Sequence, residues 1–289
     1  MTPRNDAAGR EPMPVDESVF SNALHEAAAR CVRLSDEQVR ALRRRRRGVA
    51  AGGGTILAVA ALLLMTREGP SPTPVAPGSW ARTLATRAGE KAAVTLADGS
   101  SVRLDGATRV RIVYSAGGRS ARLLAGQAFF DVRHDPSRPF VVHAGGADAR
   151  VLGTAFDLGM TRRQVSLAVY RGAVGFDPAG SPRGVVVPAG YRSNMRNGVP
   201  ERPVRFDPSL PDWREGWIDT AGMRLDDLVE VLRREGDTRV VMPGEPLASM
   251  QVFGRFRTDR PQQLLRAIGA ELGFRVVEEP DGITLKPMR

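Results

Sequence analysis

The sequence predicts an α+β protein that has one transmembrane helix, then an all-β domain of solenoid or roll type, and last a small βαββαβ-like domain. Three observations lead to this prediction: an uncharged apolar run, a long region of short apolar alternations, and a final region in which apolar residues return to helical spacing. The chain has 289 residues, whereas one domain usually spans about 100 to 200. We therefore expect two domains besides the membrane segment.

The apolar run covers residues 48–65, GVAAGGGTILAVAALLLM, and contains no charged residue. As a helix it would be about 27 Å long, close to the hydrocarbon thickness of a bilayer. Residues 43–47 are five consecutive arginines, whereas only Arg67 lies just beyond the run. By the positive-inside rule, we expect the amino terminus in the cytoplasm and the larger part of the chain exported. A cleaved signal peptide is the alternative, but the charged region before the run is long for one.

Gly48 and Gly52 in this run form a G-x-x-x-G pair, which lets two membrane helices approach closely. Glycine is frequent in membrane helices in any case. The pair is therefore only a weak indication of a homodimer.

The segment before the run predicts two short amphipathic helices, one over residues 16–30 and one that opens at Ser35 with a capping box. This arm is too short to build its own core, so its apolar residues would gain stability by docking on a partner. A largely disordered tail is the alternative. The candidate partner contacts are Val19, Phe20, Leu24, Val39 and Leu42.

A proline-rich stretch at residues 66–80 predicts an extended spacer, after which short apolar alternations recur between turn signals. Val94 and Leu96 are expected to pair with Val102 and Leu104 across Asp98-Gly99, in a hairpin with a type I′ turn. No long helical pattern interrupts the region. These features predict the all-β domain.

A second proline-rich stretch marks the next boundary, and the apolar period then becomes helical at Leu225, Leu228, Val229 and Leu232. Trp217 and Ile218 could supply a first strand. The remaining expected elements are strands at 239–242 and 251–256, a helix at 261–272, and strands near 274–277 and 283–285.

The chain thus divides into six expected segments. They are a cytoplasmic arm at 1–47, a transmembrane helix at 48–65, a linker at 66–80, a β domain at 81–199, a second linker at 200–212 and a carboxy-terminal domain at 213–289.

Composition and motifs favour a non-enzyme without a cofactor. The formal charge is +10, but all basic residues except Lys91 and Lys286 are arginine, a bias that base composition can produce, so a nucleic-acid partner is not expected. Cys31 is the only cysteine, and the three histidines, His25, His134 and His143, lack the neighbours of a metal site or a nucleophile relay. No phosphate-binding, dinucleotide-binding or G-x-S-x-G motif is present.

Several segments, in one order, carry a resemblance to a known family: VTLADGSSVRLDGATRV, GQAFFDVRHDPSRPFVV, VLGTAF and GAV. In these segments the chain resembles the FecR family, transmembrane regulators of extracytoplasmic-function sigma factors. The motif residues are Asp98, Gly99, Gly126, Phe130, Asp131, Arg138, Pro139, Phe140, Gly153 and Thr154. The carboxy-terminal region is similar to the secretin and TonB short N-terminal domain.

The resemblance implies an inner-membrane protein whose periplasmic part contacts the signalling domain of a TonB-dependent receptor, and whose arm holds a sigma factor, as an inhibitor or an activator. Iron or another TonB-dependent substrate would be the signal. The alternative from another class is an envelope scaffold that binds glycan or a secretion channel and has no sigma factor. An exported hydrolase is a third interpretation, which would need a convergent acid and base pair.

The bond between Gly153 and Thr154 is a candidate self-cleavage site. In some members of the family, the threonine hydroxyl attacks the preceding carbonyl in an N-to-O acyl shift. The alternative is a glycine that only permits a tight turn or a close approach of strands. Arg138 is expected to pair with Asp131 or Asp135, as a structural tie worth about 0 to 1 kcal/mol.

Overall fold

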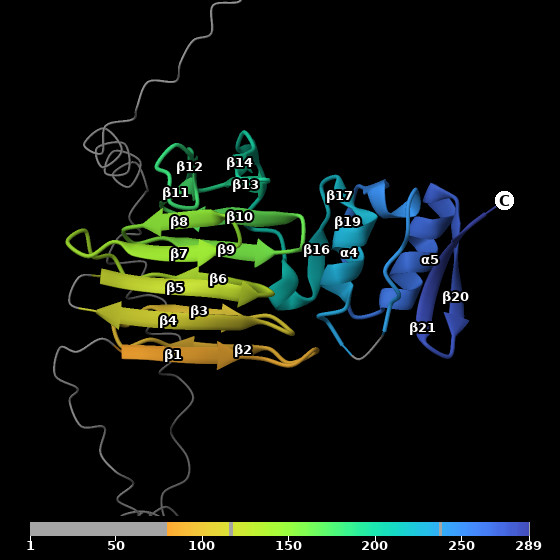
Figure 1. Ribbon diagram of the computed structural model, residues 1–289, viewed down its shortest axis with the longest axis horizontal. Coiled ribbons are helices and arrows are strands. Elements are labelled where there is room, and N and C mark those ends of the chain that lie inside the picture. The colour runs from red at the N-terminus through yellow and green to blue at the C-terminus, as the bar shows by residue number, and fades with distance from the viewer. Residues whose placement is uncertain (1–79, 116–117, 237–238, 289) are drawn as a thin grey trace, which may run out of the picture.

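The computed structural model describes residues 80–115, 118–236 and 239–288, which form a β lobe and a smaller carboxy-terminal lobe beside it (Figure 1). The first sheet of the β lobe, sheet A, has seven strands in the order β1-β4-β5-β7-β8-β11-β12. Their bounds are β1 (Trp80–Ala85), β4 (Arg109–Ser115), β5 (Gly118–Ala125), β7 (Phe140–Ala144), β8 (Ala147–Val151), β11 (Ala173–Pro178) and β12 (Val185–Pro188).

The second sheet, sheet B, has eight strands, seven in the order β14-β13-β10-β9-β6-β3-β2, with β15 also paired to β13. Their bounds are β2 (Ala92–Thr95), β3 (Ser101–Leu104), β6 (Gln127–Asp131), β9 (Ala155–Met160), β10 (Gln164–Arg171), β13 (Tyr191–Arg196), β14 (Val199–Pro200) and β15 (Val204–Arg205).

The two sheets enclose one apolar core, because alternate side chains of each strand point inward. Phe130 of β6 stacks on Phe156 of β9 with ring centroids 5.3 Å apart, and Phe140 of β7 lies 6.4 Å from Phe130. The chain crosses repeatedly between the sheets, so neither sheet is made from consecutive strands alone.

The predicted hairpin of β2 and β3 forms and pairs Val94 with Val102, but Ala92, rather than Val94 or Leu96, lies opposite Leu104. The predicted type I′ turn is wrong, because Gly99 has a positive φ of 84° and Asp98 does not. The Gly99 N–H donates to the Leu96 carbonyl, which leaves a longer loop in which only the glycine is left-handed.

The carboxy-terminal lobe has its own core, built mainly from two helices and short strand pairs. The predicted strand at 251–256 is broken, because Gly254 with φ 138° separates β18 from β19. The predicted strand at 239–242 is reduced to one bridge from Val240 to Ile283. The elements are η1 (Trp213–Glu215), β16 (Trp217–Asp219), β17 (Met223–Arg224), α4 (Leu225–Leu232), η2 (Leu247–Ser249), β18 (Gln251–Val252), β19 (Arg255–Arg257), α5 (Pro261–Leu272), β20 (Phe274–Glu279) and β21 (Gly282–Pro287).

The predicted fold class is wrong. The described residues are mostly β, and α4 and α5 are the only α-helices among them. The carboxy-terminal strands form three separate pairs rather than one βαββαβ sheet. The β lobe is no solenoid, since a solenoid stacks repeats that contact only their neighbours, whereas this chain crosses between two sheets. No helix within the described ranges is long and apolar enough to span a bilayer. The predicted transmembrane helix at 48–65 and the arm at 1–47 lie outside those ranges.

Candidate functional site

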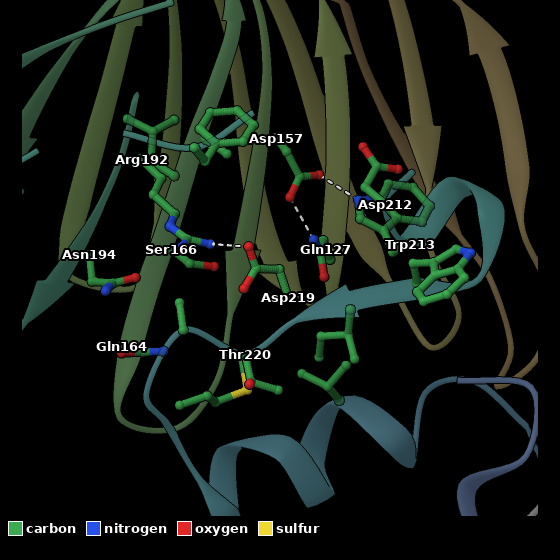
Figure 2. A pocket seen from close by; sticks show the side chains of 18 of the residues that line it. Gln127, Asp157, Gln164, Ser166, Arg192, Asn194, Asp212, Trp213, Asp219 and Thr220 are labelled. Carbon is green, nitrogen blue, oxygen red and sulfur yellow. Dashed lines mark hydrogen bonds and ion pairs between the residues drawn. The ribbon is translucent and has the colours of Figure 1, made fainter. Parts of the chain in front are cut away.

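A cavity of ≈ 350 Å³ lies where the carboxy-terminal lobe and the segment before it meet sheet B (Figure 2). Sheet B lines it with outward side chains of β10 and β13, among them Gln164, Ser166, Arg192 and Asn194. The opposite wall comes from β16 and the end of α4. The cavity is therefore a feature of the contact between the lobes.

Asp157 of β9 is the most deeply buried acid on this wall, 7% exposed. The Trp213 Nε1–H donates to its Oδ1 (2.7 Å), and the Gln127 Nε2–H donates to its Oδ2 (2.5 Å), as the dashed lines in Figure 2 show. Burial raises the pKa of Asp157 to about 7, although these two hydrogen bonds favour its charged form. Asp157 thus anchors the first helical turn of the carboxy-terminal lobe to sheet B.

A second polar cluster holds the same turn. The Asp212 carboxylate accepts from the Tyr170 hydroxyl (2.7 Å) and from the Arg214 guanidinium (2.6 Å). The Arg214 guanidinium also lies 3.9 Å from the ring centroid of Phe129. Burial opposes the charge on Asp212, but the hydrogen bonds from Arg214 and Tyr170 outweigh it and lower the pKa of Asp212.

Ion pairs join the lobes around the cavity. Arg192 Nη1 lies 2.9 Å from Asp219 Oδ2, and Arg163 Nε lies 2.8 Å from Asp226 Oδ2. Most of these partners are partly exposed, so each pair adds little to stability, about 0 to 1 kcal/mol. Their geometry shows which surfaces of the two lobes face each other.

A more buried ionic cluster lies at the edge of the same interface. The Lys91 ammonium is 3.5 Å from Asp105 and 3.3 Å from Glu235, and it donates to the Trp213 carbonyl (2.6 Å). Burial raises the pKa values of both Asp105 and Glu235. This cluster brings buried charges from both lobes together.

The backbone of Arg234, just after α4, is held directly by the β lobe. The Gly89 N–H donates to the Arg234 carbonyl (2.8 Å). The Arg234 side chain is 6% exposed, and burial lowers its pKa. A main-chain hydrogen bond therefore joins the end of α4 to the β lobe.

Two of the motif residues, Asp98 and Arg138, meet away from the cavity, at Arg119 of β5. Its guanidinium is buried, lies 2.8 Å from Asp98 Oδ2, and donates to the carbonyls of Arg138 (2.9 Å) and Arg133 (3.2 Å). Burial opposes the charge on Asp98, but the Ser100 amide and Arg119 lower its pKa overall. Arg119 thus ties the β2–β3 turn to the loop that precedes Phe140.

Of the two partners proposed for Arg138, the structure places Asp135 beside it (2.9 Å), whereas Asp131 pairs with Arg171 (2.6 Å). The Arg138–Asp135 pair is largely exposed and closes a short loop. Hydrogen bonds from Ser137 and Arg138 lower the pKa of Asp135.

The Gly153–Thr154 bond lies between β8 and β9. A Cβ on Gly153 would be 2.5 Å from the His134 Cα, so only glycine permits this approach. The Thr154 side chain is 2% exposed, and its hydroxyl donates to the Ala173 carbonyl (3.0 Å). Self-cleavage at this bond stays a prediction.

The motif glycine Gly126 also has a steric reason. It has φ 86°, and a Cβ there would be 2.2 Å from the Thr108 hydroxyl oxygen. Pro139 lies at the end of the loop, next to buried Phe140. The motif residues therefore form the β lobe's turns and core, apart from the cavity.

The structure does not describe the predicted partner contacts in the arm, Val19, Phe20, Leu24, Val39 and Leu42. Reasoning from the sequence missed Arg119, Asp157 and Asp105, because each reads as an exposed polar position. The one available signal is Trp213 just after the second linker, since tryptophan is enriched at interfaces and its N–H usually finds a hydrogen-bond partner when buried.

The chemistry of the cavity suits binding and conformational coupling. The Arg192–Asp219 ion pair and the Trp213–Asp157 hydrogen bond cross it from lobe to lobe. The described ranges contain no group of three or more His, Cys, Asp or Glu side chains that could hold a metal ion.

Comparison with known proteins shows which family and which solved structures the β lobe is similar to. The family model described as FecR protein matches residues 82–175. A crystal structure of a proposed anti-sigma factor from Parabacteroides distasonis ATCC 8503 at 2.50 Å resolution has a TM-score of 0.65 and 22% sequence identity, and the match covers 73% of this chain and 100% of that chain. A second such structure, at 1.65 Å resolution, has a TM-score of 0.65 and 23% identity, with 72% and 100% covered.

At this identity the likeness to the solved structures shows the fold alone. No curated protein matches the chain significantly. The family match, however, includes Asp98, Arg119 and the Gly153–Thr154 bond. Residues 82–175 therefore match a FecR domain.

Proposed function

We propose that this chain regulates a sigma factor. The observation that carries the proposal is the FecR domain at residues 82–175. The fold shared with the proposed anti-sigma factors of Parabacteroides distasonis, which extends over about three quarters of the chain, supports it. The arm at 1–47 would hold the sigma factor through its apolar residues.

The more detailed proposal is a relay across the cell envelope. The amino-terminal arm lies in the cytoplasm, and the two lobes lie in the periplasm, where they meet the signalling domain of a TonB-dependent receptor that takes up iron or another substrate. The sigma factor is of the extracytoplasmic-function class. The arginines at 43–47 and the FecR-like segments support this arrangement.

The contact between the lobes is the element on which a receptor would act. It is polar and partly buried, with ion pairs at Arg192–Asp219 and Lys91–Glu235. Interfaces of this kind between domains permit relative motion more readily than apolar ones. A receptor that binds one arrangement of the lobes better than another would shift the equilibrium between them.

Affinity purification of the tagged full-length chain from its own cells tests the central proposal. We expect a sigma factor to be recovered with the chain, and F20A/L24A to reduce its recovery. The control S21A/N22A, which changes two polar neighbours in the same predicted helix, should retain it. If no sigma factor is recovered, and deletion of residues 1–47 leaves transcription unchanged, the envelope scaffold becomes the better explanation.

Sidedness has its own test. An alkaline phosphatase fused after residue 289 should be active, because that enzyme needs an oxidising compartment. Activity only of a cytoplasmic reporter at this position would contradict the proposed relay.

A further inference from the structure

The outer face of sheet A carries a group of arginines on two neighbouring strands. Arg109 and Arg111 lie on β4 and Arg122 on β5, and all three are exposed. Arg111 is directly opposite Arg122 in the antiparallel register. We call Arg109, Arg111 and Arg122 the arginine patch.

These charges have no compensation within the described ranges. None of the three guanidiniums forms an ion pair or a side-chain hydrogen bond there, whereas Arg163, in the turn before β10, and Arg192 of β13 do. Like charges directly opposite in a sheet are destabilising. The position of Arg111 against Arg122 is therefore a cost to the folded domain, which binding of an anionic group would offset.

The neighbouring positions do not supply that anionic group. On the adjacent strand β7, His143 lies opposite Arg122. The His143 Nδ1 lies 2.7 Å from Asp148 on β8. Asp148 also accepts from the Gly180 N–H. Asp148, the acid of this row nearest to the patch, is thus already engaged, and it lies two strands away from Arg122.

An exposed apolar side chain adjoins the patch. Leu124 is two residues after Arg122 on β5, on the same face, and is 45% exposed. The face therefore combines forked cationic donors with an apolar contact. This is the composition of a protein-binding surface, in which arginine is enriched.

We propose that the arginine patch docks an acidic segment of a partner protein. Arg109 and Arg111, two residues apart on one strand, are separated by about 7 Å, and Arg111 and Arg122 by about 5 Å. Residues at positions i and i+3 or i+4 of a helix have Cβ atoms about 5 to 6 Å apart, which lies between these two intervals. Each guanidinium can bind one carboxylate through two parallel hydrogen bonds.

This inference goes beyond the sigma-factor regulator and is independent of it. It concerns the sheet opposite to the one that meets the carboxy-terminal lobe. The patch could therefore be present whether the protein regulates a sigma factor or serves as a scaffold.

Titration of the purified full-length chain with a labelled alanine-rich helical peptide, with glutamates at i and i+4 spacing, tests the proposal by fluorescence anisotropy. The peptide should bind, and affinity should fall as salt rises, because these charges are exposed. The variant R111S/R122S should bind at least about tenfold more weakly. The same peptide with glutamine in place of glutamate should not bind.

The matched control is R260S/R275S, which removes two exposed arginines from the carboxy-terminal lobe. Its affinity should equal that of the unchanged chain, and an equal loss in both variants would mean that only net charge matters. A last experiment measures binding to vesicles with and without anionic phospholipid. If R111S/R122S abolishes binding to anionic vesicles while the peptide binds neither protein, the surface is a lipid-binding one and the proposal is wrong.

Discussion

Gly106 and the Arg234 carbonyl approach so closely that a Cβ on Gly106 would lie 1.9 Å from that oxygen. The two residues belong to different lobes, and Gly106 has no positive φ, so the requirement for glycine arises from the contact between the lobes. A methyl group at this position would clash with the main chain of the other lobe.

We expect G106A to separate the lobes while each keeps its own core, because the added carbon meets main-chain atoms that cannot move alone. Small-angle scattering should show a larger radius of gyration, and limited proteolysis should cut faster within residues 200–212. The control G146A adds a methyl where nothing lies within 4 Å and should change neither result. An unchanged radius in G106A would show that the interface adapts.

Asp157 should make stability depend on pH in a defined direction. Burial raises its pKa from 3.8 to about 7, so the folded chain holds this proton more tightly than the unfolded chain does. The contribution of Asp157 to the free energy of unfolding is then fully present below pH 4 and falls as the pH rises to about 7, by up to about 4 kcal/mol.

The variant D157N should remove this dependence. Its amide oxygen can accept from Trp213, and Gln127 can turn its own oxygen toward the new amide N–H. Urea unfolding at several pH values between 4 and 8 should give a flatter curve for the variant. Parallel curves for the two proteins would show that Asp157 does not titrate in this range.

Trp213 should stabilise the fold through its hydrogen bond to Asp157 as well as through the packing of its ring. W213F keeps an aromatic ring but removes the N–H that donates to Asp157, which leaves a buried carboxylate with one fewer partner. We expect a loss of about 1 to 3 kcal/mol in the free energy of unfolding. The loss should shrink in the D157N background, and W80F, at a half-buried tryptophan of β1, serves as the packing control.

Arg119 and Arg138 should differ sharply in their effects although both lie in the FecR domain. R119A removes the partner of the mostly buried Asp98 and should lower the free energy of unfolding by about 3 to 5 kcal/mol. R138A breaks a largely exposed pair and should cost about 0 to 1 kcal/mol. Equal losses in thermal or urea unfolding would contradict the structural role assigned to Arg119.

The Gly153–Thr154 bond allows a direct test of self-cleavage. If the Thr154 hydroxyl attacks the Gly153 carbonyl, T154A should abolish cleavage while T154S, which keeps a hydroxyl, should retain it. Immunoblotting of chains tagged at both ends would show the two fragments. If the wild-type protein gives only the full-length band, with and without inducer, the result would count against self-cleavage.

The elements that follow from the sequence are those with local signals. The helix expected at 261–272 coincides with α5 (Pro261–Leu272), because Pro261 suits its first turn and Gly273 with φ 75° ends it. The β2–β3 hairpin is likewise set by neighbouring residues. The strand expected at 239–242 is reduced to one bridge from Val240 to Ile283, so its pairing depends on a residue far along the chain.

The overall fold class and the site depend on partners that are far away in the chain. Asp157 and Trp213 are 56 residues apart, and Asp157 lies in the alternating strand AFDLGM, where a polar residue reads as exposed. Its burial comes from a segment that packs on sheet B only in the folded chain. The order of strands in sheets A and B is equally invisible to local periodicity.

The crossing of the chain between sheets has a consequence for any cut at residue 153. A nick there would leave β1 to β8 on one fragment and β9 to β15 on the other, yet β6 pairs with β9 and β8 pairs with β11. Both halves would thus remain interleaved through two ladders of hydrogen bonds. Scission alone would not release them, and a pulling force or local unfolding would be needed to part the pieces.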